Sequence, residues 1–70
     1  MGITGKIYGI NGPVITIQGN PGYKMNEMVY VGEHRLVGEV IRLSKEKTTI
    51  QVYEETAGIR PGELVTGTGA

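Results

Sequence analysis

The segment from Tyr53 to Glu63 holds the residues of this chain that most resemble catalytic machinery. It contains the neighbouring carboxylates Glu54 and Glu55 and the cation Arg60, beside glycines and a proline. Two carboxylates act as general acid and general base when both reach one substrate. On an extended chain, however, neighbouring side chains point to opposite faces. We therefore expect Glu54 to end a strand and Glu55 to begin a solvated turn, and we predict no catalytic residue here.

Metal and nucleophile chemistry lack the necessary residue types. The chain has no cysteine and a single histidine, His34, which rules out thiolate ligands and makes a zinc centre improbable. His34 lies in a polar stretch before a predicted strand and is expected to be an exposed turn residue. Glu39 is expected to have a structural partner, such as an arginine or a backbone N–H, rather than a catalytic role. The sequence predicts no metal site.

Phosphate binding is the next chemistry that twelve glycines suggest. A P-loop requires a second glycine followed by Lys-Ser or Lys-Thr at the start of a helix. Here Gly5-Lys6 is followed by Ile7, and the stretch 19–24 has the wrong spacing. We expect turns at both places and predict that no residue of this chain binds a cofactor.

Charge and aromatic content bear on larger partners. Seven basic residues balance seven acidic ones, whereas nucleic-acid binding normally depends on a basic excess. Four tyrosines are the raw material for base stacking, but they are scattered and are not interleaved with basic residues. No apolar run approaches the roughly 20 residues of a membrane span. Nucleic acid and direct membrane insertion are therefore not expected.

Six short segments rich in valine, isoleucine and threonine are predicted as strands, because these residues suit a pleated, half-buried surface. No segment sustains helical periodicity. Residues 1–70 are therefore predicted to form a single all-β domain, a closed barrel of six strands. The predicted strands are 3–10, 14–18, 28–31, 35–43, 47–53 and 63–66.

An internal repeat supports the barrel. Residues 5–11 and 16–18 recur in pattern at 38–44 and 49–51, with a constant offset and no gap. A weaker echo is the Pro-Gly pair at 21–22 and again at 61–62. Three strands repeated twice predict pseudo-two-fold symmetry and leave no open sheet edge.

Glycine and proline mark the predicted turns. Asn-Gly at 11–12 indicates a tight turn, and the following proline suits the first residue of a strand. Ala57-Gly58 is expected to supply a left-handed residue, and the Pro-Gly pair at 61–62 a tight reversal. The candidate turn and bend positions are Gly5, Gly12, Pro13, Gly38, Gly58 and Gly62.

The segment 35–43 has apolar residues on both predicted faces. Leu36 and Val40 share one face, and Val37, Ile41 and Leu43 share the other. A small barrel has only one interior, so the second face needs another cover. We interpret Val37, Ile41 and Leu43 as candidate contacts with another subunit.

These residues together carry a family resemblance. The pattern Gly5-x-Ile-x-x-Ile-x-Gly-Pro-Val14 is followed by Met-Val-x-Val-Gly at 28–32 and by Leu-Val-Gly-Glu-Val-Ile-Arg-Leu at 36–43. The block Thr-Ile-Gln-Val-Tyr-Glu-Glu-Thr-x-Gly at 49–58 completes it. In this order they closely resemble the N-terminal domain of the catalytic A subunit of vacuolar/archaeal-type rotary ATPases.

The resemblance implies a Greek-key barrel with a structural role. Barrels of neighbouring A and B subunits would form a ring in a complex that couples ATP hydrolysis or synthesis to proton or sodium transport, at the cytoplasmic face of a membrane. ATP and Mg would bind a later domain, so no catalytic residue carries over. Self-association of the isolated domain stays open. The alternative is a standalone or engineered barrel that binds nucleic acid or peptide.

Overall fold

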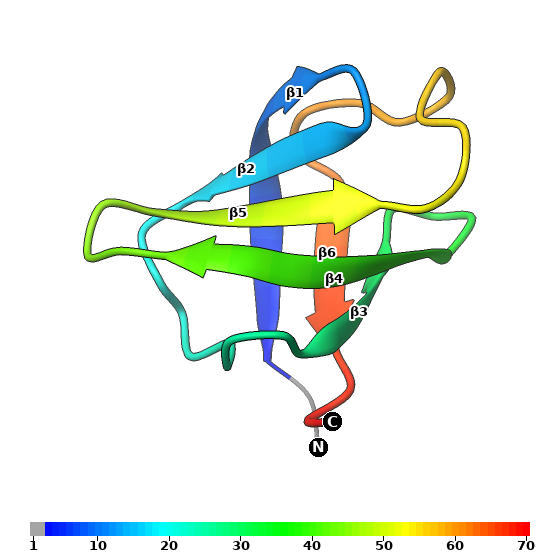
Figure 1. Cartoon of the computed structure of the whole chain (residues 1–70). Helices are drawn as coiled ribbons and strands as arrows, with labels where there is room; N and C mark the ends of the chain where they lie inside the picture. The colour runs from blue at the N-terminus through cyan, green and yellow to red at the C-terminus, as the bar shows by residue number, and fades with distance from the viewer. Residues whose placement is uncertain (1–2) are drawn as a thin grey trace.

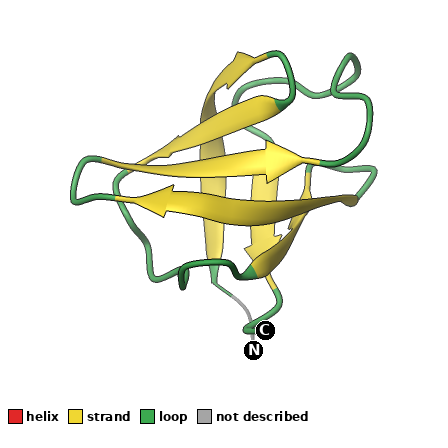
Figure 2. Ribbon diagram, viewed as in Figure 1, coloured by secondary structure: helices red, strands yellow, loops and turns green. Residues whose placement is uncertain are grey.

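The computed structural model describes residues 3–70 and contains six strands, all antiparallel, which close into one barrel (Figures 1 and 2). Their order around the barrel is β1-β2-β5-β4-β3-β6. The predicted all-β closed barrel is confirmed, and each predicted strand boundary lies within one residue of the observed one. The strands are β1 (Thr4–Asn11), β2 (Val14–Gln18), β3 (Met28–Val31), β4 (Leu36–Leu43), β5 (Lys47–Val52) and β6 (Leu64–Gly67).

The connectivity is a Greek key. The consecutive strands β3, β4 and β5 pair in series, and β2 lies beside β5 rather than beside β3, which is the arrangement that defines the motif. The start of β1 and the C-terminus lie at the same end of the barrel (Figure 1). We call this the exit end and the opposite one the far end.

Alternating side chains fill the interior, as the two-residue period of a strand requires. Nine of the buried core residues come from strands. The other two come from the two long loops: Tyr23 from loop 19–27, between β2 and β3, and Ile59 from loop 53–63, between β5 and β6. Each loop therefore folds over one end of the barrel and inserts a side chain into it. The strand residues of the core are Ile7, Ile15, Ile17, Val29, Val31, Val40, Ile50, Val52 and Val65.

The predicted internal repeat is confirmed by the strand pairing, which is equivalent in the hairpins β1–β2 and β4–β5. Ile7 pairs with Ile17 in the first hairpin and Val40 pairs with Ile50 in the second, at positions 33 residues apart. Both hairpins carry a register shift at the same place, one residue after Ile7 and one after Val40. A β-bulge inserts one extra residue in one strand and bends it. The two bulges therefore curve β1 and β4 in equivalent ways.

The Pro-Gly pairs at 21–22 and 61–62 do not occupy equivalent positions in the two halves of the barrel. The turn Arg60–Glu63 matches the turn Lys24–Glu27, not the Pro-Gly pair at 21–22. Glu63 N donates to Arg60 O at 3.2 Å and Glu27 N donates to Lys24 O at 3.1 Å. The third residues of both turns have positive φ, 95° at Gly62 and 66° at Asn26. Asparagine replaces glycine there because it tolerates the left-handed region.

Two other turn predictions require correction. Gly12 has φ of 61°, but Pro13 is the second residue of the two-residue turn and β2 begins at Val14. Pro13 therefore contributes its carbonyl, which accepts from Val52 N at 2.8 Å. Gly58 lacks the positive φ expected for a left-handed turn residue.

Gly5 and Gly38 occupy equivalent strand positions where the backbone is crowded. A Cβ at Gly5 would lie 3.1 Å from the side chain of Ile17, and a Cβ at Gly38 would lie 2.9 Å from the carbonyl oxygen of Gln51. Backbone atoms cannot rotate away as a side chain can. Gly38 is therefore the more restrictive of the two positions.

We predict that Gly38→Ala destabilises the barrel by about 1–3 kcal/mol, the usual cost of overpacking. The matched control is Gly58→Ala, because nothing lies within 4 Å of a Cβ at that position. The control variant is expected to stay within about 1 kcal/mol of the parent chain. Urea unfolding followed by circular dichroism measures both, and equal stability of the two variants contradicts the packing argument.

Candidate assembly surfaces

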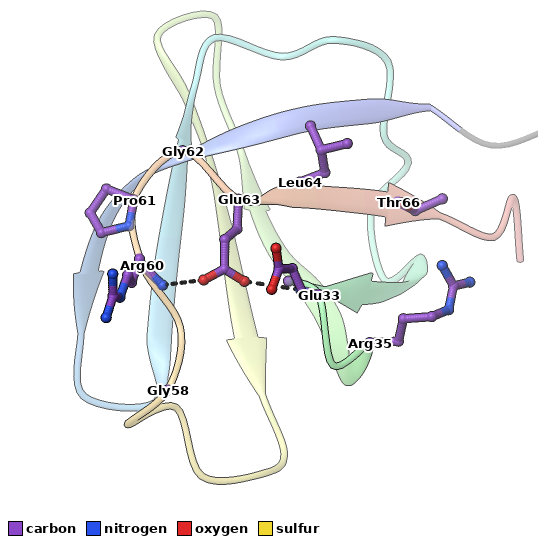
Figure 3. Close-up of a pocket in the computed structure, with 10 residues that line it drawn as sticks. Glu33, Arg35, Gly58, Arg60, Pro61, Gly62, Glu63, Leu64 and Thr66 are labelled. Carbon is purple, nitrogen blue, oxygen red and sulfur yellow. Dashed lines mark hydrogen bonds between the residues drawn. The ribbon is translucent and has the colours of Figure 1, made fainter.

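An open groove of about 860 Å³ lies at the far end of the barrel (Figure 3). It lies between the turn after β3 and the turn before β6. Glycine backbone and the polar residues of these turns form much of its lining. The lining includes Glu33, Arg35, Arg60, Glu63 and Leu64.

The Glu63 carboxylate joins the two turns that flank this groove. One oxygen accepts from Glu33 N at 2.9 Å and the other accepts from Arg60 N at 2.8 Å. Hydrogen bonds from these two backbone N–H groups hold the pKa of Glu63 below its usual value. A carboxylate stabilised in its charged form is a poor general acid. Glu63 therefore serves the turn geometry.

The cations of the groove do not converge on a common point. In Figure 3 the side chains of Arg35 and Arg60 extend from opposite sides of the groove. The Arg35 guanidinium lies over the ring of Tyr30, 4.5 Å from its centroid, in a cation–π contact. The groove consequently presents two separated positive groups and no assembled acid–base pair.

The acid-rich segment 53–59, which follows β5, is held against the barrel by hydrogen bonds and one buried side chain. Strand β5 ends at Val52, and Glu54 accepts a hydrogen bond from Val37 N at 3.1 Å. Thr56 donates through its hydroxyl to Gly12 O at 2.8 Å. Ile59 then enters the core. Both carboxylates of this segment, Glu54 and Glu55, are exposed, and it is Glu54 that accepts the hydrogen bond from β4.

Glu39 has partners that the sequence did not indicate. Its carboxylate accepts hydrogen bonds from the Tyr53 hydroxyl and from Asn26 Nδ2, the latter at 2.9 Å. Glu39 thus has structural partners, as expected, but they are a side-chain amide and a hydroxyl rather than the arginine or backbone N–H given as examples. The bond from Tyr53, and then that from Asn26, lower the pKa of Glu39; the same bond raises the pKa of Tyr53. Tyr53 reaches Glu39 because its own N–H donates to Val37 O, which extends the strand pairing.

The candidate contact face on β4 is smaller than predicted. Val37 is half-buried on the outer surface, and Ile41 is 38% exposed at the bulge. Leu43 instead packs against the core. The bulge adds one residue, so side chains beyond it change face. Strict alternation therefore misplaced Leu43. We call Val37 and Ile41 the β4 face.

Buried polar groups belong to the fold. Tyr23 is almost fully buried, and its hydroxyl donates to Val65 O at 2.6 Å. Burial, with a smaller contribution from the Glu27 charge, raises the pKa of Tyr23 to about 12.

His34 is exposed in the turn between β3 and β4. Within residues 3–70 we find no group of three potential metal ligands and no helix able to cross a membrane.

These features define a class: a small closed Greek-key barrel whose described polar side chains mainly hold its own turns. The chain belongs to the ATP synthase alpha/beta family, because the model of that family's beta-barrel domain matches residues 7–69.

Relatives point to one branch of this family. The chain is 56% identical over 68 residues to the A subunit of the A-type ATP synthase of Methanococcus maripaludis, and the match covers 97% of this chain and 12% of that protein. It is 58% identical over 66 residues to the same subunit from Pyrococcus horikoshii, covering 94% of this chain and 7% of that protein. The Thermococcus kodakarensis protein is also 58% identical over 66 residues, covering 94% and 11%. The chain thus spans about a tenth of the curated relatives it matches.

We predict that the Glu63 carboxylate makes stability depend on pH. Its pKa is lowered in the folded chain from an ordinary value of 4.5. It therefore stabilises the fold above that value, and the contribution is lost as pH falls through the folded pKa. Glu63→Gln is expected to lower the melting temperature at pH 7. It should also reduce the fall in melting temperature between pH 7 and about pH 3. Melting curves from pH 7 to about pH 3 test this.

Glu55→Gln is the matched control, since Glu55 is exposed. In the control variant the melting temperature should fall with pH as it does in the parent chain. If the melting temperature of the Glu63 variant falls with pH as much as that of the parent chain, Glu63 is not the source of the pH dependence.

Proposed function

We propose that this chain is the N-terminal assembly domain of the A subunit of an A-type ATP synthase. The identity of 56–58% over nearly the whole chain to A subunits of A-type ATP synthases supports this proposal, together with the family match over residues 7–69. The domain holds the barrels of neighbouring subunits together and takes no part in the chemistry. In the assembled enzyme the partners are the barrels of adjacent subunits, and the complex is peripheral at the cytoplasmic face of a membrane.

The closed fold determines how such a domain makes contacts. Every strand pairs on both sides, so no free edge is left to add a strand from another chain. Contacts between barrels must then use side chains on the outer faces. Exposed apolar residues supply them, and the β4 face offers Val37 and Ile41. Buried apolar contact is the main source of affinity in such an interface.

Nucleotide chemistry belongs elsewhere in the parent subunit. Of the seven carboxylates of this chain, Glu39, Glu54 and Glu63 already accept hydrogen bonds from its own fold. The glycines lie in turns or crowded strands rather than at the start of a helix. We propose that ATP and Mg bind the parent subunit outside this domain.

We predict that the chain associates in native mass spectrometry with the barrel domain of the B subunit of an A-type ATP synthase. Ile41→Glu and Val37→Glu should each weaken this association roughly tenfold or more, because a charge is buried against a partner. Lys45→Glu at the exposed hairpin tip before β5 is the control for added negative charge and should have little effect. Circular dichroism verifies that each variant is folded.

Three results contradict the proposal. The first is an absence of association with the barrel of any such subunit. The second is MgATP binding to this chain in calorimetry. The third is oligonucleotide binding at low salt that weakens steeply as salt rises, which marks a nucleic-acid module. If both β4-face variants associate as tightly as the parent chain, the contact between barrels lies on another face.

A further inference from the structure

The outer face of the β4–β5 hairpin has two ends that are well separated. Strand β5 buries every second residue from Thr48 onward, so Lys47 at its start and Tyr53 just after its end both lie on the outer side. Tyr53 N donates to Val37 O at 2.9 Å, which holds Tyr53 in line with the strand. The positions of Lys47 and Tyr53 are about 20 Å apart along an extended strand. In Figure 1 the hairpin tip and the segment after β5 lie at opposite ends of the strand pair.

One end of this face is concave, basic and partly apolar. A groove of about 560 Å³ crosses β1, β2, β5 and β4, and its lining includes Ile41, Arg42 and Lys47. Among the described residues that line this groove there is no carboxylate. Lys45 and Glu46 form the hairpin tip beyond it, and their charges offset each other. We call the surface formed by Ile41, Arg42 and Lys47 the basic groove.

The other end of the face is acidic and is held in place by the fold. Glu54 accepts its hydrogen bond from the backbone of β4, and Glu39 accepts from the Tyr53 hydroxyl. The Tyr53 side chain is 58% exposed beside these carboxylates, and Glu55 is exposed next to them. We call Glu39, Tyr53, Glu54 and Glu55 the acidic end. It presents three carboxylates around one exposed aromatic ring.

The remaining carboxylates provide no comparable concentration of negative charge. Glu27 is buried. Glu46 lies between two lysines in the sequence. Glu33 and Glu63 line the groove at the far end, which also contains two arginines. The acidic end is therefore the surface of this chain that best matches a groove lined by cations.

Opposite charges at opposite ends make this face complementary to itself. When two copies pack face to face with their β4–β5 hairpins antiparallel, the acidic end of each lies over the basic groove of the other. This arrangement has a two-fold axis perpendicular to the strands, so the same contact is made twice. Sheets packed face to face lie about 10 Å apart, a gap that long charged side chains span. Ile41 lies between Glu39 and Arg42 on β4, so it falls near the axis and is covered.

We propose that the outer face of the β4–β5 hairpin docks a second copy of this chain, with Tyr53 and its neighbouring carboxylates in the partner's basic groove. The chain has no net charge, so overall repulsion does not oppose the pairing. This inference goes beyond the proposed function, because it concerns two identical chains and requires no other subunit.

Charge complementarity determines the orientation and the choice of partner more than the affinity. The apolar contribution comes from Ile41 and Tyr53, which are both exposed in the single chain. The dimer is therefore antiparallel and sensitive to salt. Sedimentation equilibrium over a concentration series measures it. Its dissociation constant should rise roughly tenfold between about 50 mM and about 500 mM sodium chloride, because salt screens the charge pairs.

Two charge-reversal variants test the orientation. Arg42→Glu with Lys47→Glu makes both ends of the face negative, and Glu54→Lys with Glu55→Lys makes both ends positive overall. Each double variant alone should dimerise at least roughly tenfold more weakly than the parent chain, because like charges meet. An equimolar mixture of the two should form a heterodimer, which native mass spectrometry identifies by its mass.

Controls separate the contact from folding and from net charge. Lys6→Glu with Lys24→Glu changes the net charge as much as the basic-groove variant does, but at residues outside the hairpin. This control should dimerise within roughly threefold of the parent chain. Circular dichroism verifies folding. If the Glu54 variant unfolds, Glu55→Lys alone keeps the hydrogen bond to β4 and should still weaken the dimer severalfold.

A chain that stays monomeric at every concentration and salt overturns this inference. Dimers that persist in both charge-reversal variants overturn it as well, because the contact would then lie elsewhere. A mixture of the two variants that forms no heterodimer excludes the antiparallel pairing. Binding of the B-subunit barrel to this face, while the chain alone stays monomeric, assigns the face to a contact between different subunits and also overturns the inference.

Discussion

Pairing between the two halves of the sequence is the constraint on which this structure depends. Within each three-strand repeat only one pair of strands is hydrogen-bonded, β1 with β2 and β4 with β5. The remaining four pairings, β2–β5, β1–β6, β3–β4 and β3–β6, join one repeat to the other. Strand β3 has no partner at all from its own repeat. Neither half can therefore bury its apolar face alone, and a chain with no disulfide depends on closing the whole ring at once.

The carboxylates show how a small fold uses its charges. Glu27, Glu39, Glu54 and Glu63 each accept hydrogen bonds from backbone or side-chain groups of the fold. In a barrel with two long loops, many backbone N–H groups have no strand partner, and a nearby carboxylate satisfies them. The acidic stretch after β5 looks like catalytic chemistry in the sequence for this reason. Within it, Glu54 holds the segment to β4 and Glu63 joins two turns.

The sequence predicted what depends on local pattern. Valine, isoleucine and threonine marked the strands, and a repeat with constant offset indicated the symmetry, because both are written along the chain. The face of Leu43 was mispredicted, since the bulge that moves it depends on a pairing register that the sequence does not display. Tyr53 as the partner of Glu39 was missed for a similar reason. The Glu27 and Glu63 turns left a signal that was overlooked: a basic residue three positions before a glutamate, with asparagine or glycine between them.

The position of the two ends has a further consequence. The exit end is where a barrel of perfect symmetry would have a turn like the one between β3 and β4, and Ile3 and Gly67 are already joined there by a hydrogen bond. The covalent order of the strands is thus separable from their spatial order. A circularly permuted chain, cut at the exposed turn near His34 and linked across the exit end, would keep all six pairings while it presented its new termini at the opposite end of the barrel.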